Sequence, residues 1–387
     1  MDSAKITAEM KSRARELGFA MCGVCPAVRP PGAARLDEWL AAGFAGEMKY
    51  LADRREAVAD PNRVLEGARS ILMLAMNYRT AEPRSPGAGE GQVSRYAWGD
   101  ADYHDVIHER LNTLIDFIHE VAPAALARGV VDTAPLLERE FAQLAGLGWV
   151  GKNTLLLNRQ SGSWFFLAAV LTDLELAYDT PHATDHCGTC RACLDACPTG
   201  AFPQPYVLDA SRCISYLTIE LRSQIPVELR EAMGDWVFGC DVCQEVCPWN
   251  SKSPWSREAA FAPRGDSNPL DLVGLFELDD LAFRERFRHT PLWRPRRRGL
   301  LRNAAISLGN RPTPAAMPAL LRGLNDDESL VRGACAWALG RYSGGEAARA
   351  LELRLAVEID PQVRGEISAA LSQRVDADRS AAAESNA

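Results

Sequence analysis

The chain has 387 residues, 47% of them hydrophobic, and a formal net charge of −8 at pH 7. This composition predicts a globular protein of two or three domains. The charge argues against a protein that coats nucleic acid over its whole surface, although a local basic patch could still bind it. No apolar run approaches the ~20 residues of a membrane span, so we expect a cytoplasmic protein with no membrane contact. We also expect a monomer.

The first 175 residues alternate between helical and strand patterns, which predicts an α+β domain around a mixed sheet. The run Ser70–Met76 is apolar on both faces, as expected of a central strand that helices cover on either side. Further helices are expected over residues 6–17 and 33–42, and further strands over residues 19–24, 154–157 and 164–172.

Two cysteines, Cys22 and Cys25, form a C-x-x-C pair near the amino end. Such a pair can be a redox motif, but this one lies on the first predicted strand and no helix follows it. Packing in the core is the favoured interpretation.

Two polar residues, His104 and Asp132, lie at the borders of predicted helices and strands. The stretch Arg95–His104 leads into a long helix expected to end near Val121, and the pattern alone predicts that His104 is a satisfied surface group. Asp132 ends a short apolar strand, and a helix is expected to start at Thr133. Asp132 could point into a ligand crevice, but the pattern by itself favours a helix cap.

A glycine-rich loop spans residues 146–154. Gly146, Gly151 and Lys152 fit part of a phosphate-binding G-x-x-x-x-G-K pattern, but Asn153 stands where a magnesium-binding hydroxyl is required. We therefore expect no nucleotide hydrolysis, and we interpret the loop as backbone that can approach a large ligand.

Eight of the eleven cysteines lie between Cys187 and Pro248, in two runs that each end in Cys-Pro. An iron–sulfur cube needs four thiolates, and in two-cluster ferredoxins the fourth cysteine of each run binds the other cube. This rule predicts a ferredoxin-like domain over residues 176–255 with two [4Fe–4S] clusters. The first set is Cys187, Cys190, Cys193 and Cys247, and the second is Cys197, Cys213, Cys240 and Cys243.

Structural zinc and disulfides are the alternatives. Zinc sites also use C-x2-C pairs, but they need no Cys-Pro endings, and the amino end of the chain has no pattern of a signal peptide.

The last third of the sequence is repetitive. The segment Leu300–Gly309 recurs as Val331–Gly340 and weakly as Val363–Leu371, which predicts HEAT-like helical repeats over residues 256–375. We expect residues 376–387 to be disordered. Many arginines precede and enter the first copy, with aromatic residues among them, a pattern typical of phosphate contacts.

With these patterns the chain resembles the epoxyqueuosine reductases, cobalamin-dependent iron–sulfur enzymes of tRNA modification, up to about Gly340. Besides the cysteine runs, the resemblance rests on Arg95–Gly99 with Asp102-Tyr103-His104, Asp132–Pro135, Gly148–Thr154, Gly162–Phe166 and Cys213–Glu220.

The resemblance implies that epoxyqueuosine at the wobble position of tRNA is reduced to queuosine with loss of water, the last step of queuosine biosynthesis. Electrons would pass from an outside donor through two [4Fe–4S] clusters to cobalamin. Asp132 would be the proton donor, with a pKa raised by burial against the cofactor.

The resemblance also implies binding residues. Those for cobalamin are Tyr96, Lys152, Asn153, Thr154, Ser215, Asp241 and Val242. Those for tRNA phosphates are Arg222, Arg294, Arg296, Arg297, Arg298 and Arg302.

Two departures from the family pattern stand out. Ile107 replaces the glycine of a D-x-H-x-x-G cobalamin motif, so histidine ligation of cobalt is not expected, and Val58 stands where a basic residue is typical.

Two other functions compete with this interpretation. A reductive dehalogenase would carry a twin-arginine export signal and no basic helical end. A plain electron carrier would need neither the leading sheet domain nor the arginine-rich helices.

Overall fold

The computed structural model describes residues 2–384, and of residues 375–384 only the backbone. The chain forms two compact units, each assembled from separate stretches. Unit 1 contains the described residues up to Glu82 together with residues 99–211 and 241–262. Unit 2 contains residues 83–98, residues 212–240 and the described residues from Pro263 onward. The stretch expected as a ferredoxin-like domain, residues 176–255, is thus divided between the two units.

A four-stranded sheet forms the centre of unit 1, in the order β1-β2-β7-β4. Every neighbouring pair is antiparallel, so the expectation of a mixed sheet was wrong for this unit. The four strands are β1 (Met21–Pro26), β2 (Ser70–Asn77), β7 (Phe165–Thr172) and β4 (Ala127–Val130).

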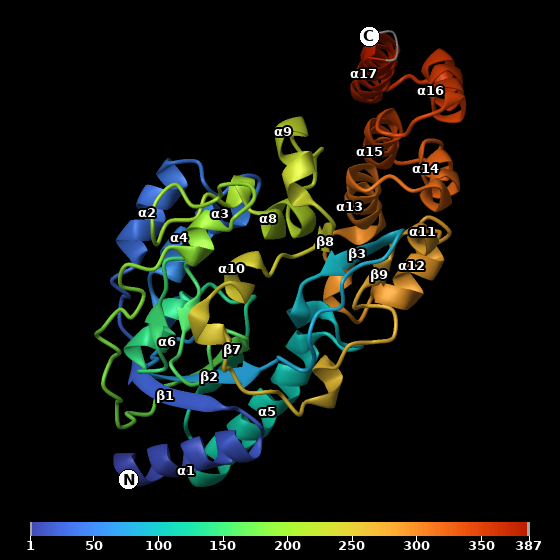
Figure 1. The fold of residues 1–387 in the computed structure, drawn as a ribbon. Helices are drawn as coiled ribbons and strands as arrows, with labels where there is room; N and C mark the ends of the chain where they lie inside the picture. Colours follow the sequence, from blue (N-terminus) through green and yellow to red (C-terminus); the bar gives the residue numbers. More distant parts are fainter. Residues whose placement is uncertain (1, 385–387) are drawn as a thin grey trace. The chain divides into compact units, whose positions relative to one another are not determined.

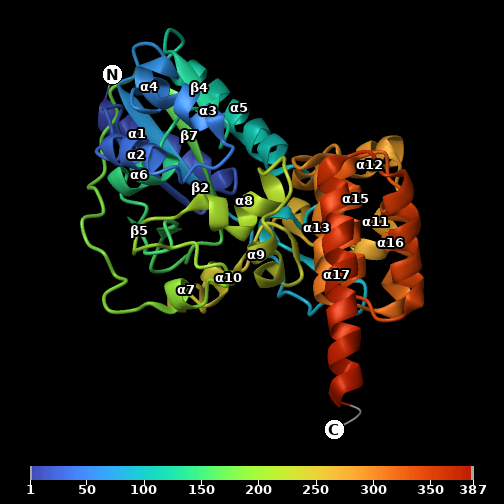
Figure 2. The ribbon, with the colours of Figure 1, turned by 90° about the horizontal axis from the view of Figure 1, so that it is seen from above.

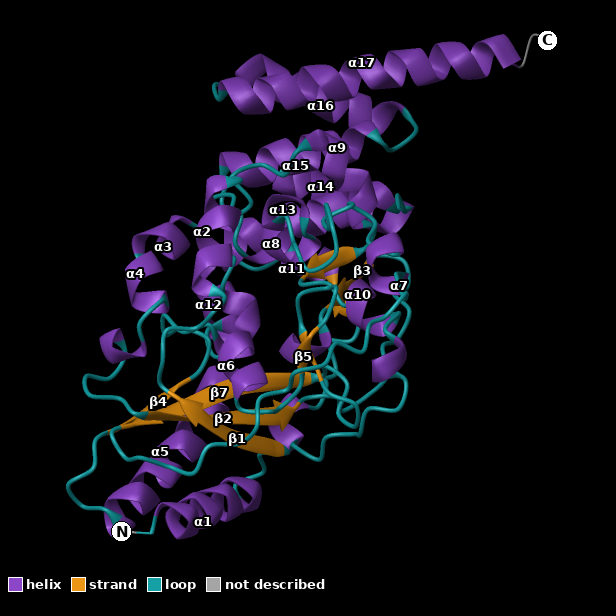
Figure 3. Ribbon diagram, turned by 90° about the vertical axis from the view of Figure 1, so that its left-hand side faces the viewer, coloured by secondary structure: helices purple, strands orange, loops and turns teal. Residues whose placement is uncertain are grey.

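Helices cover both faces of this sheet, as the apolar run of β2 predicts. Helices α1 (Ser3–Glu16) and α5 (Tyr103–Val121) lie on one face, and α6 (Glu138–Leu144) lies on the other (Figures 1 and 3). All eight residues of β2 are buried. Because successive strand side chains point to opposite faces, both helical layers receive apolar contacts.

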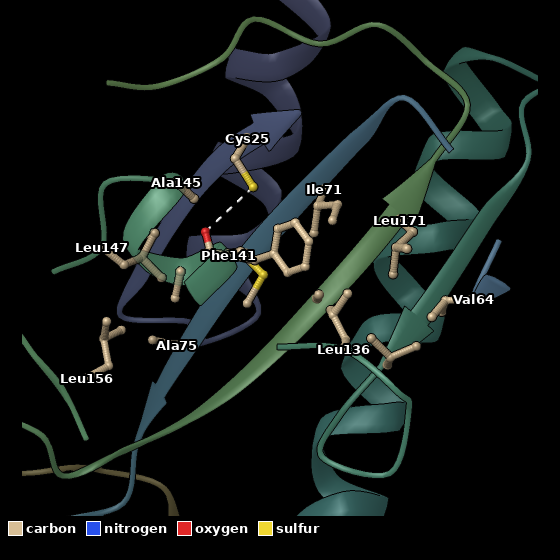
Figure 4. Close-up of a cluster of buried hydrophobic side chains, with 14 of the residues drawn as sticks. Cys25, Val64, Ile71, Ala75, Leu136, Phe141, Ala145, Leu147, Leu156 and Leu171 are labelled. Carbon is tan, nitrogen blue, oxygen red and sulfur yellow. Dashed lines mark hydrogen bonds between the residues drawn. The ribbon is translucent and has the colours of Figure 1, made fainter. Parts of the chain in front are cut away.

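The core between the sheet and α6 contains Ile71, Met73 and Ala75 from alternate positions of β2. Phe141 of α6 packs against them and is fully buried (Figure 4). Cys25 belongs to this core, and its thiol lies 3.5 Å from the carbonyl oxygen of Phe141. Core packing is therefore confirmed for Cys25, whereas Cys22 is only half-buried. Burial raises the pKa of the Cys25 thiol to about 12.

The other elements of unit 1 are short. They are α2 (Ala33–Ala41), α3 (Lys49–Asp53), α4 (Arg55–Val58), the hairpin β5 (Trp149–Val150) and β6 (Leu156–Leu157), α7 (Ala192–Asp195) and α10 (Val242–Glu245).

Unit 2 combines a small sheet with stacked helices. Strand β3 (Glu90–Val93) pairs in parallel with β8 (Trp236–Phe238) and antiparallel with β9 (Leu270–Asp271). Helices α13 (Arg296–Asn310), α15 (Ser329–Gly340) and α17 (Pro361–Glu384) lie side by side (Figure 2). The remaining helices are α8 (Ile214–Ile219), α9 (Val227–Arg230), α11 (Leu272–Leu275), α12 (Asp280–Phe287), α14 (Met317–Gly323) and α16 (Gly345–Val357).

The repeated Leu-Gly at the end of the first two copies has a packing reason. A Cβ atom at Gly309 would lie 2.7 Å from the Trp337 ring of α15, and one at Gly340 would lie 2.8 Å from Ala370 of α17. Glycine therefore lets consecutive copies approach closely. These contacts confirm the helical repeats that the sequence predicts.

The end of the chain differs from its prediction. Helix α17 continues to Glu384, so residues 376–384 have helical backbone where a disordered tail was expected. Three consecutive alanines, Ala381–Ala383, favour this continuation because alanine has the highest helix propensity. Residues 385–387 lie outside the described part of the chain. No helix among the described residues has the length and apolar character needed to cross a membrane.

Candidate active site

Asp132 lies just beyond the carboxyl end of β4. Its backbone has a φ of 55°, a left-handed conformation that few residues other than glycine adopt. Helix α6 begins only at Glu138, and its cap position is Leu137, so the predicted helix start at Thr133 and the capping role for Asp132 were wrong. The Asp132 side chain is 63% exposed and accessible to a ligand.

The first residues of α5 contact the Asp132 carboxylate. The hydroxyl group of Tyr103 donates a hydrogen bond of 2.9 Å to Oδ2 of Asp132, and Nε2 of His104 lies 3.5 Å from the same oxygen. The Tyr103 ring stacks on Phe166 of β7 with a centroid separation of 4.2 Å. Packing against the sheet therefore holds the Tyr103 ring in place beside Asp132.

Asp102 caps α5 and holds His104. Its Oδ1 atom accepts a 3.0 Å hydrogen bond from the backbone N–H of His104 and lies 2.7 Å from Nδ1 of the same residue. Nε2 of His104 is buried and has no hydrogen-bond partner among the described residues. The prediction of a satisfied surface histidine was wrong, because the helix cap turns the imidazole toward Asp132.

The groups around Asp132 favour the ionised form of its carboxyl group. The nearby imidazole of His104 and a hydrogen bond from Tyr103 lower the pKa of Asp132, although desolvation opposes them. Burial by itself lowers the pKa of His104, but the contact with Asp102 and the charges of Asp102 and Asp132 raise it to about 9. In this structure the proton therefore resides on His104. The rise in the pKa of Asp132 that burial against the cofactor would cause stays a prediction.

Glu138 lies behind Asp132. Its Oε1 atom accepts a 2.8 Å hydrogen bond from the backbone N–H of Asp132. Burial and the charge of Asp132 raise the pKa of Glu138 to about 8. A neutral carboxyl group therefore supports the strained backbone without adding charge at neutral pH.

Four of the predicted cluster ligands converge within unit 1. Cys187 and Cys247 both pack against Trp149. Burial and the charges of Cys247, Cys187 and Cys190 raise the pKa of Cys193 to about 11. This is the first predicted set, and iron would relieve the mutual repulsion of its thiolates.

Neighbouring side chains hold the first cluster loop. Nζ of Lys152 donates hydrogen bonds of 2.5 Å to the carbonyl of Gly188 and 2.9 Å to that of Cys190. Burial raises the pKa of Cys187, and Trp149 packs beside this thiol. Sequence reasoning missed Trp149, and no spacing pattern of the chain would have identified it.

The second predicted set of cluster ligands is divided between the two units. Cys197 and Cys243 belong to unit 1, and Cys213 and Cys240 belong to unit 2. The second set therefore stays a prediction from spacing.

The predicted cofactor residues divide in the same way. Tyr96 and Ser215 belong to unit 2, and the others belong to unit 1. Within unit 1, Asn153 is buried, and its side chain donates a weak 3.4 Å hydrogen bond to the carbonyl of Cys243. Thr154 has a φ of 64°, and its carbonyl accepts a 2.8 Å hydrogen bond from Arg139. That the backbone of this loop approaches a large ligand stays a prediction.

Two of the predicted phosphate-binding arginines instead have structural roles. Arg302 is fully buried, and its guanidinium donates to the carbonyls of Leu217, Leu221 and Ser223. Arg297 is paired with Asp326 at 2.6 Å, with only 16% of its side chain exposed. Both predictions were wrong, because the arginine run lies on a helix with a buried face.

The other four arginines gather at one surface of unit 2. Burial and the guanidinium groups of Arg294, Arg298 and Arg296 lower the pKa of Arg222, which shows that the four cations lie close together. Glu220 neutralises Arg294 at 3.0 Å. The guanidinium of Arg296 lies over the Trp293 ring at 4.1 Å. We define Arg222, Arg294, Arg296 and Arg298 as the arginine cluster.

Three family models match separate parts of the chain. Residues 59–133 match one described as epoxyqueuosine reductase QueG. Residues 186–250 match a 4Fe-4S double cluster binding domain, and residues 297–372 match HEAT repeats.

Whole relatives are similar over most of their length. An epoxyqueuosine reductase from Pseudomonas aeruginosa is 42% identical over 347 residues, which covers 88% of this chain and 96% of that protein. The enzyme from Shigella dysenteriae is 37% identical over 359 residues, which covers 92% of this chain and 94% of that protein.

Two solved structures have closely similar folds. An epoxyqueuosine reductase with an epoxyqueuosine-modified tRNA stem loop has a TM-score of 0.89 and 30% identity, covering 95% of this chain and 98% of that one. One from Bacillus subtilis has its catalytic aspartate loop swung out of the active site, with a TM-score of 0.88 and 30% identity, covering 95% of this chain and 99% of that one.

Proposed function

The chain belongs to the epoxyqueuosine reductase family, and from that premise we propose how its own residues reduce epoxyqueuosine to queuosine at the wobble position of tRNA. The observation that carries the proposal is the exposed Asp132 carboxylate, which contacts Tyr103 and His104 within the same unit as the first cluster loop. This arrangement places a proton donor in the same unit as a cluster that carries electrons.

Two [4Fe–4S] clusters bring electrons into the protein, consistent with the match to a double cluster binding domain. Cys187, Cys190, Cys193 and Cys247 hold one cluster. The packing of Cys187 and Cys247 against Trp149 supports this set, and so do the charges of the other three thiolates that act on Cys193. Cys197, Cys213, Cys240 and Cys243 hold the other. An electron donor protein or a strong chemical reductant reloads them.

Cobalamin is the cofactor that the family resemblance implies. The segment Lys152–Thr154 fits a large ligand held through backbone, because Lys152 and Asn153 already direct their side chains to cluster loops. Tyr96, Ser215, Asp241 and Val242 complete the proposed set of binding residues. When bound, cobalamin supplies a reducing centre for the epoxide carbon.

Asp132 delivers a proton to the epoxide oxygen as its carbon–oxygen bond breaks. The carboxylate is exposed, and Tyr103 orients one of its two oxygens. A proton donor at this position prevents a negative charge from accumulating on the leaving oxygen, which lowers the barrier.

The arginine cluster binds the tRNA backbone. Its guanidinium groups repel one another, and a phosphate would relieve that repulsion. Phosphate contacts of this kind position the nucleic acid, while the modified base identifies the substrate.

Anaerobic assay of the purified protein tests the function. The clusters are reconstituted, cobalamin and a strong one-electron reductant are added, and the substrate is tRNA from cells blocked at epoxyqueuosine. We expect queuosine in the digested tRNA, detected by mass spectrometry. Its absence with fully reconstituted clusters would refute the proposed function.

The variant Asp132→Asn tests the proton donor in the same assay. Turnover should fall about 100-fold or more, the usual contribution of a general acid, with cluster absorbance unchanged. Persistent activity would remove Asp132 from this role.

A further inference from the structure

The stoichiometry of the reaction requires more protons than one carboxyl group holds. Reducing an epoxide to an alkene breaks two carbon–oxygen bonds, consumes two electrons and two protons, and releases water. The electrons come from two equivalents of a one-electron reductant through the clusters. Asp132 can hold one proton at a time, so it must be recharged within the cycle. This inference rests on the proposed function.

We propose that His104 is the group that recharges Asp132, with Asp102 holding its imidazole in place. Nε2 of His104 lies 3.5 Å from Oδ2 of Asp132, and Nδ1 lies 2.7 Å from Oδ1 of Asp102. The three side chains form a line from the cap of α5 to the exposed carboxylate. His104 acts through Asp132 and is therefore a positioning and relay residue.

The contacts of His104 fix its ring and leave Nε2 close to Asp132. Its ring is stacked on Tyr103 with centroids 4.0 Å apart, and Asp102 holds both its backbone N–H and Nδ1. Nε2 is buried without a hydrogen-bond partner among the described residues. A shift of about 0.5 Å would bring it within hydrogen-bonding range of Asp132, and such bonds often tighten when substrate binds.

The surrounding charges place the proton on His104 in the resting state. Two carboxylates, Asp102 and Asp132, face the imidazole and raise its pKa to about 9 despite its burial. Arg139 and Tyr103 help to keep Asp132 ionised, and Glu138 is the other acid that faces it. At neutral pH the pair is an imidazolium next to a carboxylate.

The proton transfers then balance. One proton passes from Nε2 through Oδ2 of Asp132 to the epoxide oxygen, which becomes a hydroxyl as the first carbon–oxygen bond breaks. The Asp132 side chain is 63% exposed, so solvent can recharge the pair. A second proton follows the same path when the second bond breaks, and the oxygen leaves as water.

The test compares His104→Gln with His119→Gln in single-turnover reactions of pre-reduced, cofactor-loaded protein. His119 is exposed near the far end of the same helix, so its variant controls for changes to α5. We expect His104→Gln to slow queuosine formation about 100-fold, with tRNA affinity and cluster absorbance unchanged. His119→Gln should behave as wild type.

Chemical rescue distinguishes a proton relay from a merely structural role. Adding imidazole to His104→Gly should restore part of the rate, whereas it should leave Asp132→Asn inactive. Equal rates for His104→Gln and wild type would overturn the relay, and so would a slow His104→Gly that imidazole cannot rescue.

The pH profile gives a second test that remains usable if the His104 variants do not fold. The wild-type rate should fall as pH rises through about 9, where His104 loses its proton. Asp102→Asn keeps an oxygen at the cap but removes a charge that favours the imidazolium, so this limb should move to lower pH. An unmoved limb would overturn the relay. If wild type forms no queuosine at all, the proposed function fails instead.

Discussion

Oε1 of Glu138 accepts a 2.8 Å hydrogen bond from the backbone N–H of Asp132. The bond spans the residues between β4 and α6 and supports a backbone φ of 55° at Asp132. Non-glycine residues in this conformation are strained, and the surrounding structure must hold them there. Glu138 is therefore a candidate for keeping the proton donor in position.

Removing this acceptor should weaken catalysis without affecting the clusters. Glu138→Gln retains a carbonyl oxygen for the Asp132 N–H and should keep a rate close to wild type at pH 7. Glu138→Leu leaves that N–H without its acceptor, at a cost of about 1–3 kcal/mol, and should lower kcat about 10-fold. Single-turnover rates and cluster absorbance are the measurements. Equal rates for the two variants would show that the hydrogen bond does not position Asp132.

Glu138 should also make stability depend on pH. Its pKa is raised from 4.5 to about 8, so the folded protein retains a proton over a range where the unfolded chain releases it. The contribution of Glu138 to stability should therefore fall as pH rises from about 4.5 to about 8, and it should stay constant above that range. Thermal melting between pH 5 and pH 9 should show a flatter profile for Glu138→Gln than for wild type. Parallel profiles would contradict the raised pKa.

Arg302 should matter for stability, and Arg298 should not. Arg302→Met deprives three carbonyls of their donor, two of them buried, so we expect a loss of about 3–5 kcal/mol in the free energy of unfolding. Arg298→Met should change stability by less than about 0.5 kcal/mol, because half-exposed charges contribute little. Denaturant titration of both variants measures this difference. Similar losses would contradict the assigned roles.

The arginine cluster should control the salt dependence of tRNA binding. Replacing Arg222, Arg296 and Arg298 with alanine should make the slope of log affinity against log salt shallower by about 0.7–0.9 for each phosphate that the variant no longer neutralises. Arg349→Ala is the control, because Arg349 is an exposed arginine on α16, outside the cluster. Fluorescence anisotropy at several salt concentrations gives the slopes. An unchanged slope in the triple variant would dismiss the arginine cluster as the tRNA-binding surface.

Trp149 should tune the first iron–sulfur cluster. Trp149 packs beside Cys187, and a hydrogen bond from its indole N–H to a cluster sulfur would favour the reduced state. Trp149→Phe removes about 1 kcal/mol of this preference, so the reduction potential should become more negative by about 40 mV. A spectroscopic redox titration measures the shift. An unchanged potential would indicate that the indole serves only packing.

Local patterns predicted much of the fold because helices and strands follow the spacing of apolar residues. The long helix was expected to end near Val121, as α5 does, and the apolar run at Ser70 became the buried strand β2. Local patterns failed where contacts with residues distant in the sequence determine the local structure. The start of α6 moved from Thr133 to Glu138, because contacts with Glu138 and α5 hold the intervening loop in an irregular form.

The candidate site was predicted in part for the same reason. The spacing of Cys187, Cys190 and Cys193 identifies cluster ligands, since adjacent thiolates must bind the same cube. Nothing in the spacing indicates that Arg302 is buried or that Arg298 is half exposed, because that depends on which helix face packs.

The sequence by itself determined the chemistry available to this protein: eight thiolates at cluster spacing, helical repeats, and the motifs of its family. The tertiary structure decided how that chemistry is controlled. It brings His104 to Asp132 from 28 positions away along the chain and fixes which of the two holds the proton. A pKa depends on charges and solvent within a few ångströms, and only the folded chain brings those groups together.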